Sequence, residues 1–318
     1  MFTINHQVVN DFNALILYDD SSGTSVTVLP DCGAILNAFT VKTANSFINI
    51  IDSYNSLKDF TEGVTTKGFK GSKLSPFVCR LQHGEYHFAE NKYKINKFYL
   101  GKHAIHGLLF DRTFRITNEM AIDESAIVSL LYQYKKEDSG YPFEYDCFIT
   151  YKLEKNNKLT VTTKITNKDQ GLIPIQDGWH PYFTFNDKIN KLQLEFQSNN
   201  IVVFNEDLLP TGQLKSFQEY GSLKEIGNAQ LDNCFQLDFT ECQPLCVLRD
   251  TEKKMQLEIY PESSYPYLQI YTPPHRNSIA IENLSGPPDA FNNGIDLKIL
   301  EPGQETEFVT SYKISFIH

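Results

Sequence analysis

Six polar side chains stand in segments that are otherwise aromatic, apolar or rich in turn residues. Histidine titrates near neutrality and can donate or accept a proton, and a partly desolvated glutamate becomes a stronger base. Arginine, aspartate and glutamine each offer two or more fixed donors or acceptors for a polar ligand. Together these types suit an acid–base reaction on a small polar molecule. The six are Arg80 in PFVCR, His106 in KHAIHGL, His180 in DGWHPYF, Asp232 in QLDNCF, Gln269 in YLQIYT and Glu282 in IAIENLSGPPDA.

Glu282 is the most unusual of the six. It follows the apolar run Ile279-Ala280-Ile281, which predicts a strand, and it precedes a loop rich in Gly and Pro. An unpaired buried charge is costly, so a carboxylate at the mouth of such a strand is either paired or functional.

Each of the other five also has a purely structural interpretation. His180 fits a hydrogen-bonded core histidine at a strand end, and His106 before Gly107 fits an ordinary turn. Asp232 could close its own turn, Arg80 could be a surface cation, and Gln269 could point outward from a strand. Taken singly, none of the five decides the chemistry.

The elements that must position these residues are short strands separated by turns. The clearest hairpin joins 145–153 to 159–165 through Asn156-Asn157, because Asn tolerates positive φ. The second strand of this hairpin places Leu159, Val161, Thr163 and Ile165 on one face. Further strands are predicted at 25–29, 126–134, 191–196, 200–204, 255–260 and 267–271.

The chain is predicted to close with a strand after the turn Glu301-Pro302-Gly303. Its one face would carry Phe308, Thr310, Tyr312, Ile314 and Phe316. Residues 47–60 fit a helix about as well as a strand at 47–51 followed by a short helix near 56–61.

Some twenty short strands without long helical patterns between them predict one large antiparallel assembly. We expect residues 1–318 to form a single all-β domain, since no repeat, low-complexity tract or linker interrupts them.

Composition narrows the class of protein. The 318 residues carry a net charge of −10, which disfavours nucleic acid or an anionic membrane as a partner. Aromatic residues make up 13 %, including 23 Phe and 17 Tyr, and this excess favours strands and polar ligand sites. The N-terminus does not resemble a signal peptide, and no stretch is long and apolar enough to span a membrane. We expect a soluble cytoplasmic protein.

The six cysteines predict neither a zinc site nor a disulfide framework. No CxxC occurs among Cys32, Cys79, Cys147, Cys234, Cys242 and Cys246. Their mostly apolar neighbours indicate reduced, largely buried thiols. The chain also lacks a P-loop, a GxGxxG after a strand, GxSxG and HExxH. Nothing in the sequence therefore predicts a bound metal, nucleotide or other cofactor.

The order and context of the six residues resemble the aldose 1-epimerase (mutarotase) family. The resemblance spans Cys79 to Gln304, and HPYF and the Glu282 segment are its most specific parts. Three positions depart from the family pattern: Cys79 stands in place of Asn, Asn233 in place of His, and Asn283 begins a segment that usually reads Thr-Gln. The matching segments are CRLQHGEYHF, HAIHG, HPYF, Pro210-Thr211-Gly212, LDNCF, LQIYT, IENLSGPPDAFNNG and LEPGQ.

The resemblance implies a β-supersandwich of about 30 twisted antiparallel strands with a sugar site in an open cleft. Glu282 would remove the proton from the anomeric O1 hydroxyl, and His180 would donate one to the ring oxygen, with His106 assisting there. The two would act from opposite sides of C1, and the reaction needs neither a metal nor an organic cofactor. Residues that would hold sugar hydroxyls are Arg80, Asp232 and Gln269. The aromatic neighbours of His180 are Trp179, Tyr182 and Phe183; one could stack on the sugar, and core packing is expected for at least two.

The sequence leaves other functions open. A hexose-6-phosphate 1-epimerase would need cations over the phosphate, for which Lys102, His103 and Arg276 are candidates. A sugar-binding module would need only the hydroxyl-holding residues, and a lyase or isomerase could act on another sugar. The expected partner is a small monosaccharide, and the chain could be a monomer or a homodimer.

Overall fold

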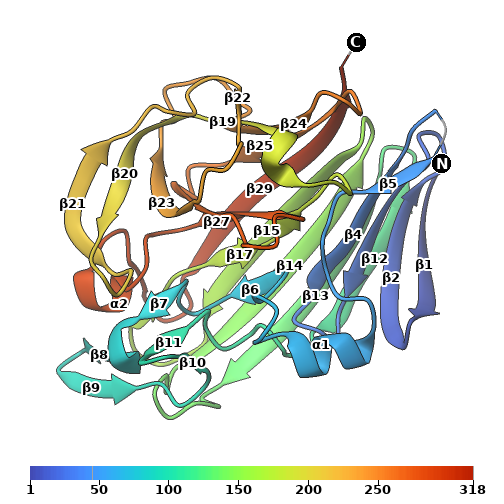
Figure 1. Cartoon of the computed structure of the whole chain (residues 1–318). Helices are drawn as coiled ribbons and strands as arrows, with labels where there is room; N and C mark the ends of the chain where they lie inside the picture. Colours follow the sequence, from blue (N-terminus) through green and yellow to red (C-terminus); the bar gives the residue numbers. More distant parts are fainter. Residues whose placement is uncertain (45, 318) are drawn as a thin grey trace.

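The computed structural model describes residues 1–44 and 46–317 (Figure 1). More buried and more exposed side chains alternate along many of its longer strands, and the strand predictions rest on this alternation. This part of the chain contains 29 strands, more than the twenty predicted by pattern alone. Strands of two or three residues are too short to show alternation, and they account for most of the difference. The fold is all-β, as predicted.

The N-terminal sheet is formed by five consecutive strands, shown in blue in Figure 1. Leu15 and Leu17 pair with Val28 and Val26 and turn one face of this sheet into the main core. Ile16 and its partner Thr27 therefore lie on the other face. The strands are β1 (Phe2–Val9), β2 (Phe12–Asp19), β3 (Thr24–Leu29), β4 (Ile35–Lys42) and β5 (Phe47–Asn49).

Helix α1 (Leu57–Gly63) follows β5 and resolves the ambiguity of residues 47–60 in favour of a strand followed by a short helix. The Ser56 hydroxyl accepts a hydrogen bond from the Asp59 amide at 3.1 Å and so caps the first turn of the helix. The second helix is α2 (Ala290–Asn293), and short 3₁₀ turns cover Gln82–Gly84 and Ile189–Lys191.

The largest sheet has nine strands in the order β12-β13-β14-β15-β29-β25-β24-β19-β22. The predicted hairpin is confirmed as β14–β15, with Asn156 and Asn157 at φ 62° and 56°. The predicted closing strand is confirmed as β29, whose unbroken register places Phe308, Thr310, Tyr312, Ile314 and Phe316 on one face. This face is buried from Phe308 to Ile314, and Phe316 is exposed at the strand end. The strands are β12 (Arg115–Ile122), β13 (Ser125–Lys135), β14 (Glu144–Glu154), β15 (Lys158–Asn167), β19 (Gln193–Phe196), β22 (Lys224–Glu225), β24 (Cys246–Asp250), β25 (Met255–Pro261) and β29 (Glu305–Phe316).

An eight-stranded antiparallel sheet packs against the nine-stranded one. Its main path is β21-β20-β23-β26-β27-β17-β6, and β18 pairs with β27 off that path. The Asn283 amide donates to the Tyr312 hydroxyl at 3.2 Å, and the Trp179 and Tyr151 rings meet with centroids 6.1 Å apart. The strands are β6 (Ser72–Leu74), β17 (Gly178–His180), β18 (Tyr182–Phe183), β20 (Ser198–Phe204), β21 (Pro210–Ser216), β23 (Asp232–Leu237), β26 (Tyr267–Tyr271) and β27 (Ile279–Leu284).

Three smaller sheets complete the described structure. The sheet β10-β11-β7 lies beside the site described below, and the other two are the strand pairs β8-β9 and β16-β28. The pair β8-β9 lies at one edge of the molecule (Figure 1), whereas β16 is buried. Their strands are β7 (Arg80–Leu81), β8 (Glu85–Phe88), β9 (Asn91–Lys94), β10 (Tyr99–Leu100), β11 (His103–Ile105), β16 (Ile173–Ile175) and β28 (Lys298–Leu300).

Five of the six cysteines are buried, as predicted, and Cys242 is exposed. None of the six forms a disulfide with another cysteine of the described residues. Neither helix of residues 1–44 and 46–317 has the length and apolar character that crossing a membrane requires.

Candidate active site

One row across the eight-stranded sheet brings distant residues together. Gln269 on β26 is the direct cross-strand partner of Glu282 on β27, and Cys234 on β23 is the partner of Gln269. Gly178 pairs with Leu284, so the same antiparallel register sets His180, at the end of β17, opposite Glu282. Directly opposed residues project to the same face of a sheet. The histidine, glutamate and glutamine predicted from sequence therefore share one face.

The three-stranded sheet β10-β11-β7 and the loop after it position Arg80 and His106. Arg80 on β7 pairs with Ile105 on β11, and the His106 amide donates to the Cys79 carbonyl at 2.9 Å. Cys79 and His106 adopt φ of 48° and 63°, in the left-handed region that few non-glycine residues enter. Such strain costs about 1–3 kcal/mol per residue and concentrates at functional sites.

All six predicted residues line one cavity of about 330 Å³, which we call the central cavity. Asp232 and Gln269 both line this cavity. The structural alternatives, a local turn for Asp232 and an outward strand position for Gln269, therefore do not apply. Glu282 lies within β27 rather than at its mouth. The lining consists of Thr65, Thr66, Gly68, Phe69, Cys79, Arg80, Leu100, Ile105, His106, His180, Tyr182, Phe204, Leu208, Asp232, Gln269, Tyr271, Glu282 and Pro288.

The two expected catalytic groups adjoin each other inside this cavity. Nε2 of His180 lies 3.3 Å from Oε1 of Glu282, and the two side chains are only 7 % and 2 % exposed. The two side chains therefore lie side by side. O1 and the ring oxygen are bonded to the same carbon, so adjacent groups can serve both.

Burial governs the protonation of the pair. It lowers the pKa of His180 to about 4. Burial and the nearby Asp232 carboxylate raise the pKa of Glu282 well above its ordinary value, against the opposing effect of Arg80. Both shifts favour the neutral form of the pair, in which the proton is on Glu282 and not on His180. Transfer of that proton across the 3.3 Å gap turns the neutral pair into a glutamate carboxylate beside an imidazolium.

Aromatic rings fix the orientation of both histidines. The Tyr182 ring stacks on His180 with centroids 5.1 Å apart and planes 10° from parallel. His106 meets His180 edge-on at 5.0 Å and packs on Phe69 at 4.7 Å. Burial lowers the pKa of His106 well below its ordinary value, and His180 and Arg80 add to that effect. A neutral His106 carries one donor and one acceptor nitrogen.

Arg80, Asp232 and Gln269 form the polar side of the central cavity. The Gln269 amide donates to the Asp232 carboxylate at 2.8 Å. Burial raises the pKa of Asp232, while Arg80 and the Gln269 hydrogen bond counteract the rise. Within the described residues, no carboxylate lies close enough to Arg80 to form an ion pair with it. Its donors are thus free for a ligand.

Four polar atoms of this site are buried and have no hydrogen-bond partner among the described residues. A buried polar group without a partner costs free energy, so a cluster of such groups points to a ligand that supplies the partners. The atoms are Nδ1 of His106, Nδ1 of His180, Oε1 of Gln269 and Oε2 of Glu282.

The aromatic neighbours of His180 divide as predicted, with one at the cavity and two in the core. Tyr182 lines the cavity, while Trp179 and Phe183 belong to the main core. Sequence reasoning missed Tyr271, which also lines the cavity. It stands two residues after Gln269 on β26, so the two-residue period of a strand could have identified it.

The three candidate phosphate ligands do not gather at the central cavity, and none of them lines it. Lys102 pairs with Asp207 at 2.8 Å, and His103 Nδ1 accepts from the His83 amide at 3.0 Å. The Arg276 guanidinium donates to the carbonyls of Ala229 and Gly227 at 2.7 and 2.6 Å. No group of three or more His, Cys, Asp or Glu side chains in the described residues is arranged to hold a metal ion.

A family model and a curated relative match this chain. The family model described as aldose 1-epimerase matches residues 15–313. An uncharacterized Escherichia coli K12 protein, YihR, is 28 % identical over 243 residues, which cover 74 % of this chain and 75 % of that protein.

Solved structures show the same fold at low sequence identity. A galactose mutarotase-like protein from Clostridium acetobutylicum superposes with a TM-score of 0.85 at 18 % identity, over 99 % of each chain. A galactose 1-epimerase from Lactobacillus acidophilus gives a TM-score of 0.81 at 19 % identity, over 100 % of this chain and 99 % of the other.

Proposed function

The chain belongs to the aldose 1-epimerase family, and from that premise we propose that it interconverts the α and β anomers of a free hexose by acid–base ring opening and reclosure. The observation that carries the proposal is the contact between His180 and Glu282 inside a cavity whose other polar side chains suit sugar hydroxyls. His106, Arg80, Asp232 and Gln269 complete the proposed site.

In the proposed reaction the ion-paired form of the two groups acts on the closed sugar. The Glu282 carboxylate removes the O1 proton while the His180 imidazolium protonates the ring oxygen, so the bond from C1 to that oxygen breaks and C1–O1 becomes a carbonyl. The C1–C2 bond then rotates, and reclosure on the other face returns both protons. Ring opening leaves the neutral pair, the form that burial favours, so the cavity stabilises the complex with the open-chain sugar.

Polarimetry of freshly dissolved α-D-glucose and α-D-galactose tests the proposal. We expect the protein to accelerate mutarotation above the spontaneous rate, and Glu282→Gln and His180→Asn to lose that acceleration by orders of magnitude. Calorimetric sugar affinity should change within a few-fold in Glu282→Gln, because glutamine keeps the shape and loses only the base. Glu258→Gln alters a buried glutamate outside the cavity and should keep the activity.

The outcomes separate the alternatives. Sugar binding without acceleration by the wild-type protein would support a binding module. Acceleration for glucose 6-phosphate but not for glucose would support the phosphorylated substrate class. Equal loss of binding and turnover in Glu282→Gln would make Glu282 a structural residue.

A further inference from the structure

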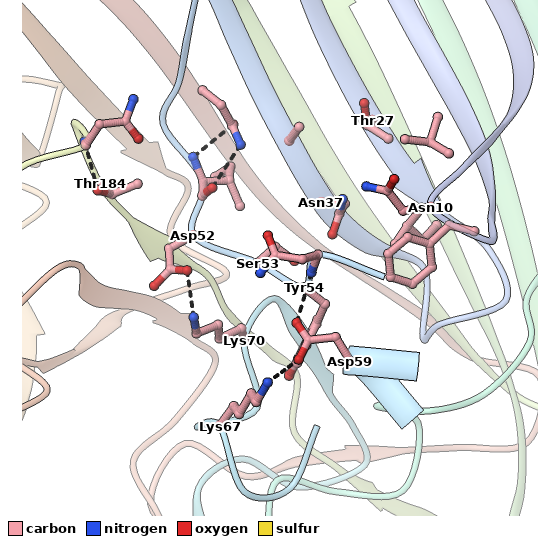
Figure 2. A pocket seen from close by; sticks show the side chains of 18 of the residues that line it. Asn10, Thr27, Asn37, Asp52, Ser53, Tyr54, Asp59, Lys67, Lys70 and Thr184 are labelled. Carbon is pink, nitrogen blue, oxygen red and sulfur yellow. Dashed lines mark hydrogen bonds and ion pairs between the residues drawn. The ribbon is translucent and has the colours of Figure 1, made fainter. Parts of the chain in front are cut away.

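A second cavity of about 980 Å³ lies between the N-terminal sheet and the segment that leads through α1 to β6 (Figure 2). Strands β2, β3 and β4 form one wall, residues 51–55 with Asp59, Lys67 and Lys70 form the other, and residues 184–188 and 275–277 close one end. It shares no lining residue with the central cavity and is about three times as large.

The wall of the second cavity that β2, β3 and β4 form, which we call its floor, is largely apolar. Ile16, Thr27 and Ala38 are cross-strand partners on β2, β3 and β4, and they form one row on the face of the sheet opposite the core. Ala14, two residues from Ile16, extends the same face. Because these side chains are small or β-branched, they project little from the sheet, and a flat ring with an apolar face can lie on them.

Amides and hydroxyls make up most of the polar side chains around the cavity, beside charged residues such as Asp52, Asp59, Lys67 and Lys70 (Figure 2). Three oxygen atoms near the cavity are buried without a hydrogen-bond partner in the described residues, namely Asn37 Oδ1, Ser53 Oγ and Tyr54 OH. The Lys70 backbone adjoins the Tyr54 hydroxyl but lies outside hydrogen-bond geometry. Asn37 and Ser53 are only partly buried, and both line the cavity. The amide and hydroxyl side chains of the lining are Asn10, Thr27, Asn37, Asn49, Ser53, Tyr54, Asn55, Thr184, Asn186 and Asn277.

Most charges of the lining are compensated by ion pairs. Asp52 pairs with Lys70 at 2.6 Å, Asp59 pairs with Lys67, and Asp187 pairs with Lys253. Lys188 donates to two neutral oxygens, the His275 carbonyl at 2.7 Å and the Asn277 side chain at 2.6 Å. A ligand with several charges would find no cluster of free counter-charges here, whereas a neutral ligand with many hydroxyls finds both donors and acceptors.

We propose that the second cavity binds a neutral oligosaccharide of two or three sugar units. Its volume is at the upper end of small-molecule sites and exceeds that of the central cavity, which is sized for one ring. The apolar floor receives the C–H faces of the sugar rings, and the amide and hydroxyl side chains of the lining pair with their hydroxyls. This site is independent of the reaction proposed for the central cavity.

The two cavities adjoin through one segment of chain. Lys67 and Lys70 face the second cavity, whereas Thr65, Thr66 and Phe69, which alternate with them, face the central one. A binding signal alone therefore does not locate the ligand, and the test requires variants in each cavity.

Isothermal titration calorimetry with raffinose, maltotriose and cellotriose tests the proposal. Raffinose has no free anomeric hydroxyl, so ring opening in the central cavity cannot contribute to its signal. We expect saturable binding of at least one of the three sugars. Ala38→Trp, which fills the floor, should weaken it at least tenfold, and the double variant Asn37→Ala, Ser53→Ala should weaken it without added bulk.

Two controls locate the site. Ala121→Trp places the same bulk on the exposed strand β12 and should leave binding unchanged, and Asp232→Ala in the central cavity should leave it unchanged as well. Circular dichroism establishes that each variant is folded. Absence of saturable binding for all three sugars overturns the proposal, and so does binding that Asp232→Ala removes while the second-cavity variants retain it.

Discussion

At the scale of single residues, the proposed chemistry depends on one proton shared by two buried groups. The pKa of His180 is lowered to about 4 and that of Glu282 is raised well above its ordinary value, and burial is the main cause of both shifts. An acid–base pair 3.3 Å apart titrates as a unit, so its pH limits belong to the pair. Only the form with one proton contains both an acid and a base.

This argument predicts an acidic and an alkaline limit of activity. As pH falls through about 4, His180 takes up a second proton and the pair loses its base. As pH rises through the elevated pKa of Glu282, the pair loses its only proton and hence its acid. We expect kcat/KM for glucose, after subtraction of spontaneous mutarotation, to fall on the acidic side as His180 titrates near pH 4 and on the alkaline side as Glu282 titrates above its ordinary range. A profile with an acidic limb near pH 6.5 would show instead that His180 titrates as an ordinary exposed histidine.

At the scale of elements, a glycine determines how closely the β11 loop approaches β6. Gly107 has φ +73°, and a Cβ there would lie 2.3 Å from the Ser75 carbonyl oxygen. Gly107→Ala should therefore displace His106 and lower both the melting temperature and kcat/KM. Gly101→Ala is the matched control, because Gly101 has φ +63° with nothing within 4 Å of its Cβ position. Equal effects of the two substitutions would assign the cost to φ alone and not to the close contact.

A buried ion pair anchors the strand that carries His180. Lys73 on β6 meets Asp177 at 2.5 Å just before β17, both side chains are fully buried, and the Tyr265 hydroxyl donates to the same carboxylate at 2.6 Å. Lys73→Met would leave Asp177 buried without its counter-charge, for which we expect a loss of about 3–5 kcal/mol in the free energy of unfolding by urea. The exposed pair Lys191–Glu252 is the control: Lys191→Met should cost less than about 1 kcal/mol. Similar costs would show that water reaches Lys73.

The lengths and pairings of the strands explain which features of the fold and of the candidate site the sequence could predict. Strands with clear alternation, such as β14 and β15, were identified within one to two residues at each end. The strands that carry Arg80 and His180 have two and three residues, too short for a periodic signal. Pairing of Gln269 with Glu282 is a register between strands, and no local pattern encodes it. Residue type and context therefore selected the six candidate residues, and family resemblance implied their roles, whereas the row that joins them required the structure.

At the scale of the whole molecule, the sheets share one core. The main cluster of buried apolar residues extends from Phe2 to Ile314, and the N-terminal sheet is tied to the nine-stranded sheet by polar contacts as well. The Tyr151 hydroxyl donates to the Ala34 carbonyl at 2.7 Å, and the Thr24 hydroxyl donates to the Asn157 side chain at 2.6 Å. These contacts support the expectation that residues 1–318 form one domain, and we propose that this domain folds and unfolds as a single unit.

A single domain should unfold in a single transition, although chains beyond about 150 residues often populate intermediates. Trp179 is the only tryptophan, it is buried, and its ring meets Tyr151 of the other large sheet, so its fluorescence reports on the packing between the sheets. Far-UV circular dichroism reports on all strands, including β1–β5. We expect both signals to share one midpoint and one slope in urea. A loss of circular dichroism before the Trp179 signal changes would contradict this, because it would mean that a strand region such as the N-terminal sheet detaches first. The wall of the second cavity would then be a separate folding unit, and sugar binding there should move the early transition to higher urea and leave the later one in place.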